Sequence, residues 1–184
     1  MRLGLAFLRI VVGALFVGHG LQKLAGKFGG HGPEGTGQFF EGVGLRPGKT
    51  HALAAGAAET GGGALIAAGA LTPLGAAALT GSMATAIKTI HLPKGPWNPE
   101  GGYEYNLVLI ASLFALTDAG PGHWSIDGAL GRERWGVGWA LAELVAGLAG
   151  SAAAIAYGRS QGEAPAPPSE PQPEATPAPS PSAE

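Results

Sequence analysis

Apolar residues along the chain fall into five blocks, separated by stretches rich in glycine, proline or charge. A helix needs about 20 apolar residues to cross roughly 30 Å of hydrocarbon, so this pattern is typical of a multi-pass membrane protein. The predicted membrane helices are Leu3–Leu21, His51–Leu71, Pro73–Leu92, Tyr103–Thr117 and Val137–Tyr157. The fourth would be only about 22 Å long, which is short for a span.

The connections near the N-terminus differ in kind. Residues 25–50 are rich in glycine and charge, which predicts a loop whose Phe39 and Phe40 dip into the membrane interface. Residues 71–73 form so short a connection that the second and third helices must make an antiparallel hairpin. Pro73 then occupies the first helical turn, where a missing N–H costs little.

The later polar segments predict turns, a connection and a tail. Residues 93–102 are turn material by their Pro, Gly and Asn content, and 120–135 form a polar, aromatic-edged connection. Residues 161–184 are rich in Pro, Glu, Ala and Ser, which predicts disorder. In the fifth helix, Gly147 and Gly150 form a G-x-x-G that would let another helix approach closely.

Composition supports the same interpretation. Charged residues make up 13% of the 184-residue chain, against about 25% in an ordinary soluble domain, and 46% of the residues are hydrophobic. The absence of cysteine excludes disulfides, thiolate catalysis, Cys-ligated zinc and iron–sulfur clusters. No basic cluster interleaved with aromatics points to nucleic acid. Any redox chemistry would therefore need a partner protein or a bound cofactor.

The distribution of Lys and Arg predicts an orientation in the cell membrane. One end of the five-helix arrangement carries Arg2, Arg132 and Arg134. The other end carries six basic residues: Lys23, Lys27, Arg46, Lys49, Lys94 and Arg159. Because cytoplasmic segments carry the excess of Lys and Arg, the richer end and the C-terminal tail are expected in the cytoplasm.

Glu59 is the acidic residue of the second predicted helix, and its place among small and apolar residues needs an explanation. A charge at the centre of a membrane helix costs about 2.5–3.5 kcal/mol on insertion scales, so Glu59 is expected to face other helices. Counted from the end of the first helix, Glu59 lies about 12 Å deep, Lys88 about 6–8 Å and Arg9 about 18 Å. Each of these two cations is thus within one long side chain of the carboxylate.

Other polar groups gather near the same face. His19, His91, Glu104 and Asn106 fall within roughly 5 Å of it, with Lys23 at its edge. The predicted result is a pocket open to one leaflet. The ligand-binding candidates are Arg9, His19, Lys23, Glu59, Lys88, Glu104 and Asn106.

Alternatives to a binding pocket remain open at this point. Arg9, Glu59 and Lys88 could form a buried ion network that only fixes helix register. His19, His51 and His91 could ligate haem or, with a carboxylate, a metal, but interfacial histidines are more often solvated and we expect neither group. An interfacial aromatic belt is predicted at Trp97, Tyr103, Tyr105, Trp124, Trp135 and Trp139.

The acidic residue of the fifth helix is harder to interpret. Glu143 has no obvious partner at its depth. We expect it either to reach the interface or to join Arg132 and Arg134.

Short motifs run in order over residues 1–131. They are an Arg…Gly…His-Gly…Lys pattern in the first helix (Arg9, Gly13, His19, Gly20, Lys23), FFEGVGL, an E-x-G-G at Glu59, and GGYEYN followed by GPGHWSID. Together they resemble the DoxX family of small bacterial membrane proteins. The resemblance implies a four-helix membrane core at 1–131. The additional membrane helix predicted at 132–160 and the disordered tail predicted at 161–184 lie beyond this core.

The resemblance also implies a function. Relatives are linked to quinone-reducing thiosulfate oxidation, quinol oxidase assemblies and protection from oxidative stress. The leading hypothesis is an all-α transmembrane bundle that serves as a subunit of a membrane redox system, with protein partners and a pocket for a quinone headgroup or small anion. Catalytic residues cannot be assigned. The alternatives are a non-catalytic scaffold or assembly factor that recruits soluble partners, and a small-solute transporter, which the lack of an inverted repeat disfavours.

Overall fold

The computed structural model describes residues 3–162, and within that range the chain is all helical, with no strand. The predicted tail lies almost wholly outside the described residues. The helices are α1 (Leu3–Ala25), α2 (Gly32–Gly42), α3 (Gly48–Ala68), α4 (Thr72–Ala86), α5 (Glu104–Ala119), α6 (Ile126–Ala129) and α7 (Val137–Ser160). A π turn (Ile87–His91) and two 3₁₀ turns (Leu92–Lys94, Asn98–Glu100) lie between α4 and α5.

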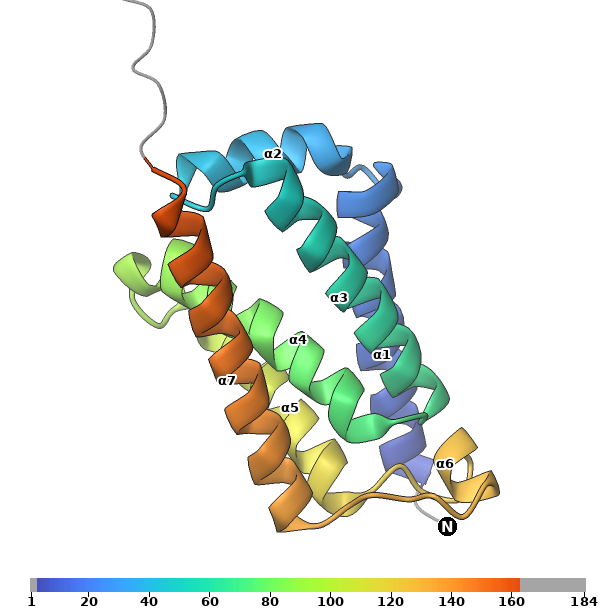
Figure 1. Cartoon of the computed structure of the whole chain (residues 1–184). Coiled ribbons are helices and arrows are strands. Elements are labelled where there is room, and N and C mark those ends of the chain that lie inside the picture. Colours follow the sequence, from blue (N-terminus) through green and yellow to red (C-terminus); the bar gives the residue numbers. More distant parts are fainter. Residues whose placement is uncertain (1–2, 163–184) are drawn as a thin grey trace, which may run out of the picture.

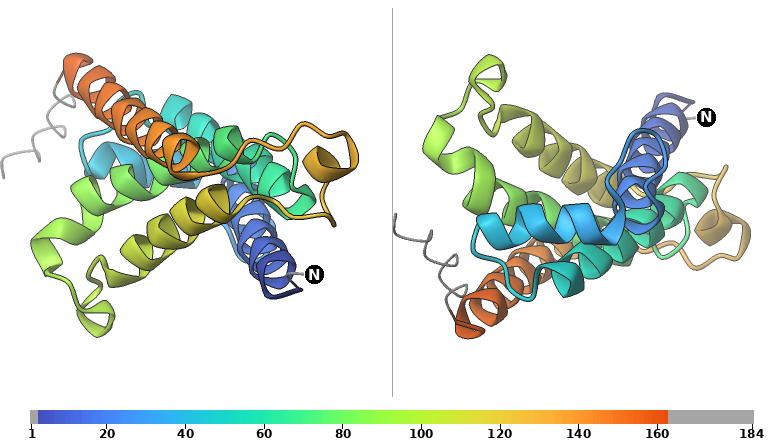
Figure 2. Two further views of the ribbon diagram at one scale, coloured as in Figure 1. Left: turned by 90° about the horizontal axis from the view of Figure 1, so that it is seen from below. Right: turned by 90° about the horizontal axis from the view of Figure 1, so that it is seen from above.

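The long helices form two groups arranged as a wedge (Figure 1). Helix α1 packs along α3, while α4 packs against both α5 and α7. The groups meet where α3 turns into α4, and they diverge toward the other end, across which α2 lies (Figures 1 and 2). The apolar core that joins them is made of Val12, Phe16, Ile66, Ala76, Leu79, Leu113 and Leu116.

Glycines set the separation of the paired helices. A Cβ on Gly13 would lie 2.5 Å from the amide nitrogen of Ala67, and one on Gly63 would lie 2.6 Å from the carbonyl oxygen of Gly13. Such distances are closer than real Cβ contacts allow, so α1 and α3 approach backbone to backbone. Small residues serve this purpose in membrane bundles, where lipid supplies little hydrophobic drive for helix association.

The predicted hairpin between the second and third helices is present and tight. Helix α3 ends at Gly69, whose φ of +63° is left-handed and whose N–H bonds to the carbonyl of Ile66. Leu71 also has positive φ, and α4 begins at Thr72 with Pro73 in its first turn. The turn places α3 and α4 side by side, as the short connection required.

The predicted loop at 25–50 is wrong in one respect, because it contains helix α2. The helix begins with Pro33 in its first turn, which suits the fixed φ of proline. Tertiary packing overrides its poor helix propensity: at Gly37 an added Cβ would lie 2.8 Å from the amide nitrogen of Lys49. Glu41 Oε1 also accepts a hydrogen bond from the Gly48 N–H at 3.0 Å, which ties α2 to the start of α3.

The third predicted helix also differs from expectation at its end. It is α-helical only to Ala86 and then widens into the π turn at Ile87–His91. π turns inside helices often mark functional places because they re-aim side chains. Here the turn carries Thr89, Ile90 and His91 to the edge of the cavity described below.

The exterior of the bundle is apolar. Large side chains such as Phe7 and Ile10 on α1, Val108 on α5 and Val145 on α7 are exposed. Within the described residues 3–162, two helices, α1 and α7, are long and apolar enough to cross a membrane.

Aromatic residues mark both ends of the bundle. Trp97 and Tyr105 are exposed at one end, and Trp124, Trp135 and Trp139 are exposed at the other. An apolar surface with aromatic side chains near both ends suits a lipid environment.

Candidate functional site

The centre of the candidate site is an ion pair between two helices. Lys23 is in the last turn of α1, and its Nζ lies 2.6 Å from Oε2 of Glu59 on α3. Glu59 is only 4% exposed, while the Lys23 side chain is 20% exposed. The prediction that a cation from another helix shields Glu59 is therefore confirmed, and the cation is Lys23.

This pair lies in the wall of a large cavity that separates the two helix groups. The cavity has a volume of about 810 Å³, within the roughly 300–1,000 Å³ usual for small-molecule sites. One side is lined by α1 and α3, the other by α4, α5 and α7, and α2 also contributes lining residues. Most lining side chains are Ala, Leu, Phe or Gly, so a bound molecule would contact mainly apolar surface.

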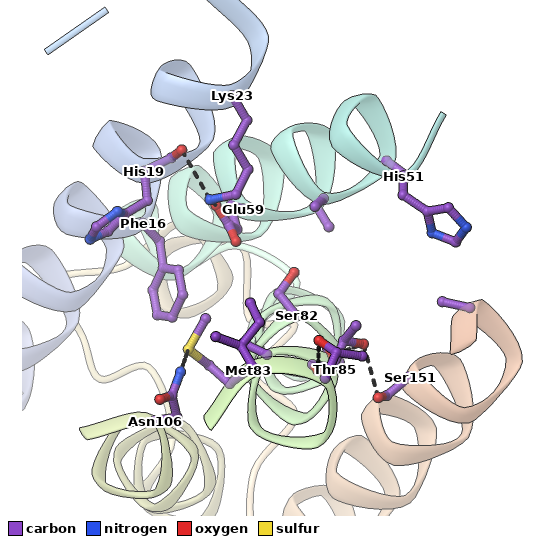
Figure 3. A pocket seen from close by; sticks show the side chains of 18 of the residues that line it. Phe16, His19, Lys23, His51, Glu59, Ser82, Met83, Thr85, Asn106 and Ser151 are labelled. Carbon is purple, nitrogen blue, oxygen red and sulfur yellow. Dashed lines mark hydrogen bonds and ion pairs between the residues drawn. The ribbon is translucent and has the colours of Figure 1, made fainter. Parts of the chain in front are cut away.

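A few polar groups interrupt this apolar lining (Figure 3). Lys23 and Glu59 face the helix that carries Ser82, Met83 and Thr85. On the far wall, the hydroxyl oxygens of Thr85 and of Ser151 on α7 are hydrogen-bonded at 2.9 Å, and Thr85 Oγ1 lies equally close to the carbonyl oxygen of Gly81. Few convergent polar groups in an apolar cavity are what a binding site needs to orient an amphipathic ligand.

Asn106 supplies a further polar group. It is buried at the start of α5 and donates from Nδ2 to the sulfur of Met83 at 3.3 Å. A thioether is a weak acceptor, so this amide can turn to a better one.

His19 also lines the cavity, although the residue is exposed. Its ring lies 3.0 Å from Oε1 of Gln22 on the same helix. The structure therefore brings four of the seven predicted ligand-binding residues to one cavity: His19, Lys23, Glu59 and Asn106.

Arg9 lies elsewhere, at the end where the helix groups meet. Its guanidinium donates to the carbonyl oxygens of Pro121 and Trp124, both at 2.5 Å, and the residue is 3% exposed. The depth count placed Arg9 within reach of Glu59, but it could not show which way the side chain turns. Arg9 binds the backbone of the α5–α6 connection instead.

Asp127 completes this second polar cluster. Its carboxylate accepts from the N–H groups of Leu71 and Thr72 and from the Thr72 hydroxyl, at 3.0–3.3 Å. The backbone N–H of Asp127 in turn donates to the carbonyl of Gly69 at 2.9 Å. The GPGHWSID motif thus fastens the α5–α6 connection to both α1 and the α3–α4 turn.

Two further predicted site residues, Lys88 and Glu104, do not line the cavity. Lys88, in the π turn, is exposed. Glu104 accepts from the Asn98 N–H at 2.7 Å and so fixes the turn before α5. His91 lies at the cavity edge, with Nδ1 2.7 Å from the carbonyl oxygen of Gly101.

Among residues 3–162, no three His, Asp or Glu side chains lie close enough to hold a metal ion.

Glu143 does not reach the interface, and no contact joins it to Arg132 or Arg134. It is 2% exposed, and its Oε2 accepts from the Thr80 hydroxyl of α4 at 3.2 Å. Arg134 lies over the ring of Trp139 instead, 5.5 Å from its centroid.

The sequence reasoning missed the hydroxyl groups of the far wall. Thr85 and Ser151 carry no charge, so the cost of burying a charge in a membrane helix did not single them out. The repeat of Glu143, Gly147 and Ser151 every four residues could have placed them on one face of α7.

The all-helical architecture, the apolar exterior and the buried polar groups define a small integral membrane protein. A family model described as DoxX matches residues 4–92. A curated protein of Bacillus subtilis (strain 168), named "Putative oxidoreductase CatD", is 33% identical over 115 residues, which cover 62% of this chain and 79% of the relative. The chain therefore belongs to the DoxX family. No solved structure matches it.

Proposed function

We propose that this protein is a quinone-binding subunit of a membrane redox complex, with the ring of the quinone held beside the Lys23–Glu59 pair. The observation that carries the proposal is a buried ion pair in the wall of an apolar cavity of about 810 Å³. The word oxidoreductase in the name of the Bacillus relative supports a redox setting. The electrons would come from a partner protein.

The chemistry of a quinone suits these groups. Its two carbonyl oxygens accept hydrogen bonds, which the Lys23 ammonium and the Asn106 amide can donate. Reduction of each carbonyl consumes a proton, and Lys23 and Glu59 are both able to exchange one. The isoprenoid tail would contact the apolar wall of small side chains on α4 and α7.

The test removes the ion pair without leaving an unpaired charge. In the double variant Lys23→Met/Glu59→Gln, neither partner is left as an uncompensated buried ion. The matched control is Lys49→Met/Glu34→Gln, which removes an exposed ion pair between α2 and α3. We expect the cavity variant to bind a short-tailed quinone analogue about tenfold more weakly, because a charge-assisted hydrogen bond is lost.

Binding is measured by titration of the purified protein in detergent, with unfolding temperature as the check on folding. A folded cavity variant with the affinity of the natural protein would contradict the quinone site. If that variant also retained soluble partners in a pull-down, a scaffold role would replace the proposal.

The proposed membrane arrangement has five spans. Helices α1, α3, α4 and α5 would form a DoxX core at 1–131, and α7 would be the added span at 132–160. Helix α5 would span about 24 Å and would require a locally thin bilayer or polar neighbours at its ends. The packing of α7 against both α4 and α5 supports its place in the same bundle.

The proposed orientation puts the α2 end in the cytoplasm, because most Lys and Arg of the described residues are at that end. The natural sequence has no cysteine, so a single introduced one is a clean reporter. In intact cells, Ser160→Cys should resist a membrane-impermeant thiol reagent, and Ala129→Cys should react. The reverse pattern would overturn the orientation.

A further inference from the structure

One buried acidic group takes no part in the cavity's ion pair. Glu143 of α7 is 2% exposed, and its Oε1 has no hydrogen-bond partner, although Oε2 accepts from Thr80. A buried carboxylate normally has a cation or several donors beside it, because an unpaired charge is costly away from water. Glu143 has only the one hydroxyl.

The helices packed on α7 offer no cation to this carboxyl. Helix α4 has no charged residue over Thr72–Ala86, and the charged residues of α5 are the acidic Glu104 and Asp118 near its ends. On α7 itself, Arg159 is in the last turn, more than four turns away. His51 of α3 contacts that same distant end, at Tyr157.

The opposite wall holds its charges in a closed pair. Lys23 and Glu59 are paired with each other in the wall that faces α7, so the charge of Lys23 is already neutralised by Glu59. In this environment, the neutral acid is the form of Glu143 that fits the one hydrogen bond observed: the Thr80 hydroxyl donates to Oε2, and the proton sits on Oε1.

Glu143 lies beside the cavity. Ala77 and Gly81, which bracket Thr80 on α4, line the cavity, as do Ala146 and Gly147, one turn beyond Glu143 on α7. Gly147 lets the helices close here, since an added Cβ would lie 2.7 Å from Thr80 Cβ.

A bonded pair of hydroxyl groups lies further along the same seam. Ser151, two turns beyond Glu143, is bonded to Thr85, whose carbonyl oxygen accepts from Thr89 at 2.8 Å. Thr85, Thr89 and Ser151 all line the cavity. Hydroxyl groups both donate and accept, so the Thr85–Ser151 pair can relay a proton, whereas Thr89 donates to a peptide carbonyl and does not extend the pair.

We propose that Glu143 is a proton-binding site in the α4–α7 seam that exchanges its proton with water in the cavity, and that this water is held by the hydroxyl pair of Thr85 and Ser151 two turns further along α7. The O–H bond on Oε1 breaks, the proton passes to water to give hydronium, and the Thr80 hydroxyl stabilises the carboxylate that is left. Reprotonation follows the same route in reverse. This site stands independently of the quinone proposal, because proton exchange and not quinone binding is what it requires.

Infrared spectroscopy of the full chain in lipid tests the site directly. A protonated carboxyl has a C=O stretching band that a carboxylate lacks. At neutral pH we expect that band in the natural protein, its loss in Glu143→Gln, and its retention in Glu104→Gln. If Glu143→Gln does not fold, Glu143→Asp keeps an acid and must shift the frequency of the band. A band unchanged by the variant at Glu143 that folds overturns the proposal.

The route is tested by transfer into D₂O, which shifts the same band as the proton is replaced. Thr85→Val and Ser151→Ala each remove one hydroxyl and should slow the shift about tenfold. Ser112→Ala is the matched control, because Ser112 on α5 donates to its own helix at Val108 and does not line the cavity. If deuterium exchange at Glu143 is as fast in Thr85→Val and Ser151→Ala as in Ser112→Ala, the route is overturned.

Discussion

At the scale of single residues, the buried charges of this protein fall into separate groups with different surroundings. Glu59 has a cationic partner and lines a cavity, Arg9 and Asp127 bind backbone groups, and Glu143 has one hydroxyl. A buried ion that lines a cavity can bind a ligand. A buried ion bonded mainly to backbone groups serves the fold, so we assign Arg9 and Asp127 a structural role.

This assignment predicts a stability effect for Asp127→Asn. The amide has one acceptor oxygen in place of two, so the N–H groups of Leu71 and Thr72 can no longer both be satisfied by it. We expect unfolding to become easier by about 1–3 kcal/mol, measured by denaturant titration in detergent.

The control is Asp118→Asn, an exposed acid at the end of α5, which should change stability little. Equal stability of the Asp127 variant and the control would contradict the structural role. Quinone affinity should be unaltered in both, because neither residue lines the cavity.

At the scale of elements, α7 is part of the site even though the matched family model ends at residue 92. It forms one wall of the cavity through Ala146, Gly147, Gly150, Ser151 and Ala154. Its far end is held by the α2–α3 connection, where Arg46 donates to the carbonyl oxygen of Gly162 at 2.8 Å. Loss of α7 would open the cavity on that side.

The G-x-x-G of α7 gives a matched pair of variants. Gly147→Ala should destabilise the protein by about 1–3 kcal/mol, because the added Cβ meets Thr80 and the carbonyl of Ala77 at under 3 Å. Gly150→Ala should be neutral or slightly stabilising, since no atom lies within 4 Å of its added Cβ. The unfolding temperature in detergent distinguishes them, and equal effects would show that α7 packs differently.

At the scale of the whole molecule, the wedge explains how a bundle of glycine-rich helices holds a large cavity. The α1–α3 and α4–α5–α7 groups are fastened at one end by the Arg9–Asp127 cluster and held apart toward the other, where α2 crosses (Figure 1). At the other end, Arg46 and His51 contact the end of α7, so the space beside Lys23 and Glu59 lies between two fastened ends of the bundle.

Part of this arrangement could be predicted from the sequence. Apolar blocks located the five long helices, and the short connection at 71–73 gave the hairpin. The cost of burying Glu59 required a cation from another helix. Helix α2 could not be predicted, because its glycines are poor helix formers and its stability comes from packing on α3 and α1. Depth in the membrane could not decide whether Lys23 or Arg9 pairs with Glu59, because the rise along a helix does not fix the direction of a side chain.

The most direct test of the central claim is photoaffinity labelling with an azido-quinone, mapped by mass spectrometry on the protein in lipid. The account predicts labels on cavity residues of α1, α3 and α4, such as Phe16, Ala55 and Met83, that unmodified quinone competes away. Labels confined to lipid-facing residues such as Phe7 or Val108, and insensitive to competitor, would contradict it.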